Sequence, residues 1–226
     1  DPSISIRYIN HLSQMGDPDL IILPGSKNTI DDLIYLNEQG MTKEILDCHH
    51  KGSLVLGICG GFQMLGNIIR DPKHVESQNS EAIGLDLFDL ETTFDAEKIT
   101  RQVELTTVSS RVFSDGLSCQ GYEIHMGRTT FKSAYPALFS CSEGLNAMDF
   151  GITNQEGTVL GTYLHGFLDK NSFRQSLLCY IREQRKIDRP SKAFDFDQFK
   201  QNEMDRLCDL LSESINMKEV SEIIGI

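Results

Sequence analysis

The sequence predicts an α/β fold with three layers, in which helices cover both faces of a mostly parallel, open sheet. Two short runs carry this prediction, Leu20 to Leu23 and Ser53 to Ile58. Both are apolar and too short for helices, as strands buried on both faces of a parallel sheet are. A helical pattern follows each run at once, and this alternation is typical of right-handed crossovers between parallel strands.

The first half of the chain is predicted to alternate strands with helices. The expected strands are Ser3 to Ile9, Leu20 to Leu23 and Ser53 to Ile58, and the expected helices are Ile30 to Asn37 and Met41 to His50. Between the second strand and the first helix lies PGSKNT, in which Asn28 or Thr29 can cap the helix. The backbone amides of this loop are then free to bind a ligand at the carboxyl edge of the sheet, although a plain turn explains the pattern equally well.

The second half is predicted to be rich in strands and to end in helices. The expected strands are Gly84 to Thr93, Lys98 to Ser109 and Gln120 to Thr130, followed by a hairpin of Phe150 to Thr153 with Val159 to Leu164 and by helices at Asn171 to Gln184 and Phe196 to Ser214, with a last short helical segment after them. We expect residues 1–188 to form one domain and residues 189–226 to form a helical extension packed on it.

Composition excludes several classes of function. The 226 residues carry a formal net charge of -12 at pH 7, which argues against a surface for nucleic acids or anionic membranes. No apolar run approaches the roughly 18 residues that span a bilayer, and we expect a cytoplasmic protein without membrane partners. The six cysteines form no CxxC pairs, so neither a zinc site nor a disulfide scaffold is expected.

One cysteine stands in a distinctive frame. Cys59 follows a predicted buried strand and is flanked by Gly57, Gly60 and Gly61, which suit a sharp turn from strand to helix. A side chain on such a turn is exposed at the carboxyl edge of the sheet. The start of the following helix favours thiolate over thiol. Cys59 is therefore the candidate nucleophile, whereas the other five cysteines have no such frame and are expected to be structural.

A cysteine nucleophile needs a base, normally a histidine that the fold brings close. His165 closes an apolar strand and precedes Gly166, so it is expected at the same sheet edge. His125 in GYEIHMG is the second candidate, and Glu123 shares its strand face. Such a pair performs acyl transfer, and backbone amides hold the oxyanion that develops on the attacked carbonyl.

The amides expected to hold the oxyanion lie in two loops. One belongs to Gly60, directly after the nucleophile, and the other to Gly25 or Ser26 in the loop after the preceding strand. The residue pattern by itself indicates a cysteine hydrolase or transferase and does not select the carbonyl compound that it attacks.

Four motifs make the prediction more specific: PGSKNT with DDL after it, GICGGFQMLG, GYEIHMGRT and GTYLHG. In this order and spacing they resemble the glutamine amidotransferase domain at the C-terminal end of cobyric acid synthases, a family of the cobalamin pathway. The similarity covers essentially the whole chain. It implies a flavodoxin-like fold and a class I, triad-type glutaminase, in which Cys59 forms a glutamyl thioester, His165 shuttles the proton, and Ser26 and Gln63 line the glutamine pocket.

The resemblance also implies a larger enzyme. Ammonia from glutamine would pass to an ATP-dependent synthetase domain that amidates peripheral carboxylates of adenosylcobyrinic acid a,c-diamide. This domain, and the first strand of the amidotransferase sheet, are expected to lie outside this chain, which contains no G-x-x-x-x-G-K-[ST] phosphate loop. ATP and Mg²⁺ are therefore expected only in the synthetase domain, and this chain is expected to bind no cofactor or metal.

The chain departs from the triad pattern at one position. Most class I amidotransferases carry a glutamate two residues after the catalytic histidine, where this chain has Phe167. We expect a Cys–His dyad, although Glu123 or an acid from a partner domain could serve instead. The alternatives are the amidotransferase part of cobyrinic acid a,c-diamide synthase, the small glutaminase subunit of a lipid II amidating complex, and a non-catalytic interaction module that retains the turn at Cys59.

Overall fold

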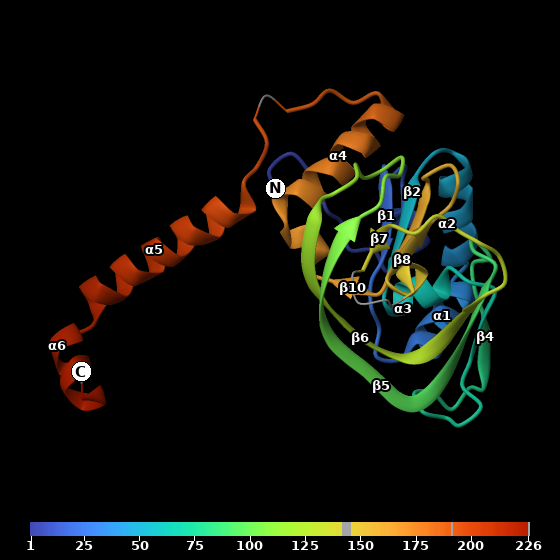
Figure 1. The fold of residues 1–226 in the computed structure, drawn as a ribbon, viewed down its shortest axis with the longest axis horizontal. Coiled ribbons are helices and arrows are strands. Elements are labelled where there is room, and N and C mark those ends of the chain that lie inside the picture. The colour runs from blue at the N-terminus through green and yellow to red at the C-terminus, as the bar shows by residue number, and fades with distance from the viewer. Residues whose placement is uncertain (142–145, 191, 226) are drawn as a thin grey trace. The chain divides into compact units, whose positions relative to one another are not determined.

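The computed structural model describes residues 1–141, 146–190 and 192–225. These residues form two compact units, shown in Figure 1: Ile6–Arg189 is the larger, and Asp1–Ser5 with Pro190–Ile226 the smaller. The larger unit contains the sheets. The smaller unit contains α5 (Phe196–Ser214) and α6 (Met217–Ile224). In the part of the chain described, no helix has both the length and the apolar character that a bilayer crossing demands.

A four-stranded sheet forms the centre of the larger unit. Its strands lie in the order β1 (Leu20–Leu23), β2 (Leu54–Ile58), β9 (Val159–Thr162) and β8 (Gly151–Thr153). The first three are parallel, and β8 runs antiparallel to β9 as the first arm of a hairpin whose second arm is β9. The predicted α/β class, the parallel strands and the hairpin are therefore confirmed.

Helices cover both faces of this sheet because the side chains of β2 alternate between two cores. Val55 packs in one core with α1 (Thr29–Glu38) and α2 (Met41–His50), whereas Leu54 and Leu56 pack in another with α4 (Asn171–Arg185). All three β2 side chains are at most 1% exposed, as the continuous apolar run predicts for a strand buried on both faces. The predicted three layers are present.

A second, mainly antiparallel sheet is built on two long strands, β5 (Leu90–Thr107) and β6 (Ser118–Phe131), which sweep beside the first sheet in Figure 1. The remaining strands are β3 (Ile68–Arg70), β4 (Glu81–Ile83), β7 (Phe139–Ser140) and β10 (Leu164–His165). The short strand β10 pairs with β6 directly after β9 ends. This pairing brings the end of the parallel sheet to the middle of β6.

Two predicted features differ from the structure, and two short strands were not predicted. Ser3 to Ile9 is not a strand: Ile6 and Tyr8 are 72% and 95% exposed, so the alternation there buries no apolar face. The two strands expected over Gly84 to Ser109 are one strand, β5, with a register shift between Thr93 and Lys98. The short strands β3 and β4, which flank the polar segment 71–80, have too few residues for a periodic signal.

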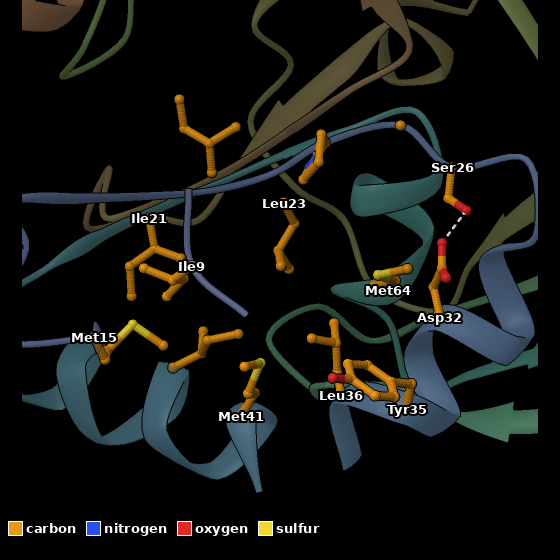
Figure 2. Close-up of a pocket in the computed structure, with 14 residues that line it drawn as sticks. Ile9, Met15, Ile21, Leu23, Ser26, Asp32, Tyr35, Leu36, Met41 and Met64 are labelled. Atoms are coloured by element: carbon orange, nitrogen blue, oxygen red, sulfur yellow. Dashed lines mark hydrogen bonds between the residues drawn. The ribbon is translucent and has the colours of Figure 1, made fainter. Parts of the chain in front are cut away.

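The strand β1 forms one edge of the four-stranded sheet, and an apolar pocket of about 260 Å³ lies beside it. Figure 2 shows Met15 and Met41 at one end of this pocket, and Ser26 with its hydrogen bond to Asp32 at the other. Neither Cys59 nor His165 lines the pocket. The loop of residues 24–28, called the Pro24 loop below, contributes Gly25 and Ser26 to the lining, so the pocket adjoins the candidate catalytic centre without containing its thiol or imidazole.

Candidate active site

Cys59 lies on a strained turn between β2 and α3 (Gly60–Met64). Its φ of 54° and ψ of -114° are rare for a residue with a side chain and cost about 1–3 kcal/mol. The turn is held because the Cys59 amide donates to the Thr162 carbonyl at 2.8 Å, and because Gly61 lets the helix approach β1 closely. A Cβ on Gly61 would lie 1.9 Å from the Leu23 carbonyl oxygen, so glycine is required there.

The structure brings Cys59 and His165 together at the Pro24 loop. A methyl group placed on Gly25 would lie 3.9 Å from the Cys59 sulfur and 3.8 Å from Cε1 of His165. One small group on Gly25 would therefore touch both side chains, although they are more than a hundred positions apart in the sequence. The thiol at the end of β2 and the imidazole on β10 therefore lie near each other although their strands belong to different sheets.

The edge of β6 completes the floor of this site. The Cys59 thiol donates to the Ile124 carbonyl at 3.3 Å, and the Gln63 side-chain amide donates to the Met126 carbonyl at 3.0 Å. Alternate carbonyls of a strand point to the same edge, and residues four apart lie on one helix face, so the two bonds run side by side. Gln63 is only 2% exposed, and its bond to Met126 holds the side-chain amide against β6.

The imidazole of His165 is positioned by strand pairing. His165 lies opposite Tyr122 in the β10–β6 ladder, and the two rings stack at 5.0 Å between centroids with an interplanar angle of 5°. Burial lowers the pKa of His165 below its ordinary value, the Ile124 carbonyl opposes this shift, and the neighbouring His125 adds to it. A neutral imidazole is the form that accepts a proton from a thiol.

The other candidate pair, Glu123 and His125, forms a separate network. The Glu123 carboxylate, 1% exposed, accepts hydrogen bonds from Arg101 and from His125 Nε2, the latter at 2.7 Å. Burial acts to raise the pKa of Glu123, but these bonds and the Arg101 charge outweigh it and lower the pKa. In the ladder Glu123 lies opposite Leu164, so it faces away from His165. Within the described residues no hydrogen bond joins Glu123 to His165.

The amides expected to hold an oxyanion lie next to the thiol. A Cβ on Gly60 would lie 3.0 Å from the Ser26 amide nitrogen, so the Pro24 loop and the start of α3 approach each other closely. The Ser26 hydroxyl donates to Asp32 and accepts from the Asn28 amide at 2.9 Å. These contacts tie the Ser26 hydroxyl to its own loop and to the first turn of α1, while the Ser26 backbone amide lies beside Gly60.

Three residues near Cys59 or His165 are not among the site residues predicted from the sequence. Tyr122 stacks on His165, Tyr163 lies close enough to Cys59 to interact with it electrostatically, and the Glu76 charge acts on Cys59. Tyr122 and Tyr163 could be found only from the strand register. Glu76 could not be found, because it belongs to an irregular polar loop.

The structure corrects the expected effect of the α3 N-terminus on the thiol. Burial raises the pKa of Cys59 above its ordinary value, the Gly60 amide lowers it, and the charges of Glu76 and Glu123 raise it further. The helix has only five residues, so its dipole is too small to outweigh burial. The surroundings of Cys59 therefore favour the thiol over the thiolate.

This protonation state predicts the pH dependence of alkylation. Because thiolate is the reactive form and the Cys59 pKa is raised, alkylation by iodoacetamide without glutamine should increase with pH through a midpoint above about 8.5, the value for a free thiol. Mass spectrometry of the peptide that carries Cys59 measures this profile, with the cysteine of a short unstructured peptide as the reference. A midpoint below that of the reference peptide would show instead a preformed thiolate–imidazolium pair.

The sequence matches known families over most of its length. Residues 1–173 match the CobB/CobQ-like glutamine amidotransferase domain. The cobyric acid synthase of Dehalococcoides mccartyi (strain CBDB1) is 42% identical over 227 residues, which cover 98% of this chain and 44% of that protein. The cobyric acid synthase of Alkaliphilus metalliredigens is 39% identical over 229 residues, covering 98% and 46%. The chain thus spans about half the length of the curated relatives that it matches.

Solved structures share the fold at low sequence identity. PurLQS from Thermotoga maritima superposes with a TM-score of 0.58 and 22% identity over 77% of this chain and 85% of that one. A glutamine amidotransferase crystal structure gives a TM-score of 0.53 and 16% identity over 81% and 88%. These likenesses confirm the predicted class I amidotransferase fold. The match over residues 1–173 shows that the chain belongs to the CobB/CobQ-like glutamine amidotransferase family.

Proposed function

We propose that this chain is the glutaminase part of a cobyric acid synthase, with Cys59 as nucleophile and His165 as its base. The observation that carries the proposal is the convergence of the thiol and the imidazole at Gly25, on the edge where a strained turn exposes Cys59. The relatives at 36–42% identity are cobyric acid synthases, which supports the choice of this pathway.

The chemistry follows from the contacts. His165 takes the Cys59 proton, and the thiolate attacks the side-chain amide carbon of glutamine to give a tetrahedral oxyanion. The amides of Gly60 and of Gly25 or Ser26 would hold this oxyanion. Imidazolium then protonates the leaving nitrogen, which departs as ammonia and leaves a glutamyl thioester. Water, deprotonated by His165, hydrolyses the thioester to glutamate and restores the thiol.

A dyad suffices for this reaction. Glu123 is bound by Arg101 and His125, while His165 is oriented by the Tyr122 ring and the Ile124 carbonyl. A cysteine is already nucleophilic near neutral pH, so it depends less on a third group than a serine does. We infer that the stack on Tyr122 takes over the orienting role of the triad carboxylate, with Gln63 and the Ser26 loop lining the glutamine pocket.

The remainder of the reaction belongs to the longer protein. Ammonia would be passed to an ATP-dependent synthetase part, where ATP and Mg²⁺ would act and peripheral carboxylates of adenosylcobyrinic acid a,c-diamide would be amidated. The twofold greater length of the relatives leaves room for such a part. We propose a cytoplasmic enzyme that acts on no nucleic acid and no membrane, in keeping with its acidic charge.

A glutamine-mimicking electrophile separates this proposal from a non-catalytic interaction module. We expect 6-diazo-5-oxo-L-norleucine to label Cys59 and to leave the other five cysteines unmodified. The probe shares the α-amino and α-carboxylate groups of glutamine, and of the six cysteines we place only Cys59 in the glutamine site. Peptide mass spectrometry locates the label, and excess glutamine should protect Cys59 from it. Uniform slow labelling of all cysteines, without protection by glutamine, would favour the interaction module.

A further inference from the structure

A carboxylate that the glutaminase chemistry does not use lies beside the nucleophile. Glu76 is half-buried, and its Oε2 accepts the Thr29 amide at 3.3 Å. Thr29 is itself 1% exposed, and its hydroxyl oxygen would lie 2.9 Å from a Cβ on Gly60, the residue after Cys59. Glu76, Thr29, Gly60 and Cys59 thus follow one another in space, and the Glu76 charge reaches the thiol.

The loop that carries Glu76 is held by several hydrogen bonds. The Asp71 carboxylate, fully buried, accepts the amides of Val75, Glu76 and Ser77 at 2.8, 2.8 and 3.0 Å. The loop is also tied to the first turn of α1, because Asn79 donates to Asp31 at 2.8 Å. The hydrogen bonds from the loop amides to Asp71 therefore hold the backbone of Glu76 in place. The bond from the Thr29 amide holds its carboxylate.

A negative charge on Glu76 opposes the formation of the Cys59 thiolate unless a cation binds to the carboxylate. A carboxylate near Cys59 disfavours the thiolate, and burial raises the pKa of Glu76 itself despite its hydrogen bonds to Thr29. Glutamine carries one positive group, its α-ammonium, which must lie a few bonds from the amide that Cys59 attacks. Pairing with that ammonium would neutralise the charge of Glu76 at the moment when thiolate is needed.

We propose that Glu76 binds the α-ammonium group of the substrate and so makes the site specific for an α-amino acid amide. This inference rests on the proposed function and adds a specificity-determining residue to it. The alternative is that Glu76 only caps the N-terminus of α1 through Thr29. The two roles differ in one respect: a cap affects every substrate alike, whereas an ammonium ligand affects only substrates that carry the ammonium.

The test compares glutamine with glutaramate, which is glutamine without its α-amino group. In the wild-type chain kcat/KM should favour glutamine at least about 10-fold, and in Glu76→Gln kcat/KM for glutamine should fall on the order of 10- to 100-fold while that for glutaramate changes less than about threefold. Glu81→Gln, an exposed carboxylate in an ion pair with Arg70, is the matched control and should leave both values unchanged.

Each outcome decides the question. An equal fall for both substrates in Glu76→Gln, or a wild-type chain that uses glutaramate as well as glutamine, overturns the role of Glu76. The wild-type comparison holds even if the variant fails to fold, a failure that its thermal unfolding curve would reveal. If the wild-type chain released no glutamate, or if Cys59→Ala released as much glutamate as the wild-type chain, the proposed function itself would be contradicted. The two failures are therefore distinguishable.

Discussion

The Cys59→Ala variant should lose glutamine-dependent activity almost entirely. Removal of a nucleophile leaves only binding and oxyanion stabilisation, so glutamate release should fall on the order of 10⁴-fold or more. In the longer protein that contains both parts, amidation with added ammonium salt should continue at the wild-type rate, because ammonia bypasses the thioester. The measurement is a paired assay with glutamine and with ammonium as the nitrogen source.

A second cysteine variant provides the control. Cys179 lies on α4, away from the strained turn, and Cys179→Ala should retain both activities. Replacing Cys59 by alanine removes only the sulfur atom and few packing contacts. The variant is therefore expected to fold. If Cys59→Ala abolished the ammonium-dependent reaction as well, or retained glutaminase activity, Cys59 would not be the nucleophile.

The His165→Asn variant should lower kcat for glutamine hydrolysis on the order of 10³- to 10⁴-fold, the usual effect of losing a general base that also protonates the leaving group. KM for glutamine should change little, because the imidazole moves protons and does not anchor the substrate. Steady-state glutamate release measures both constants. His50→Asn, on the exposed end of α2, is the matched control.

His125→Asn separates the two candidate histidines. Its ring is bound to Glu123 and stacks on Tyr163 at 3.8 Å, so the substitution should disturb packing and stability more than proton transfer. A kcat loss in His125→Asn as large as that in His165→Asn, with an unchanged unfolding temperature, would contradict the assignment of the base. The comparison therefore tests the dyad as well as the identity of its histidine.

Sequence patterns predict the parts of this fold that local physics controls. The helix over Met41–His50 matches its prediction because its apolar periodicity and the following glycine are local signals. Cys59 directly follows β2, and His165 lies just after β9, which is parallel to β2, so the order of strands places both residues near the carboxyl edge of the parallel sheet. The position of the imidazole also depends on the pairing of β10 with β6 in the second sheet, which was not predicted.

Contacts that depend on long-range register or irregular loops escape such reasoning. The stack of Tyr122 on His165 requires the pairing of β10 with β6, which no local pattern encodes. The position of Glu76 depends on Asp71 gathering three successive amides in a loop without periodicity. The false strand at residues 3–9 arises from the opposite error, an alternation that meets no partner strand.

The most direct test of the account is to trap the covalent intermediate. The chain is mixed with glutamine, quenched in acid and digested, and the peptides are analysed by mass spectrometry. The account predicts one added glutamyl group on the peptide that carries Cys59, absent from Cys59→Ala. Glutamate formed with no glutamyl group on Cys59, or with the group on another residue, would contradict it.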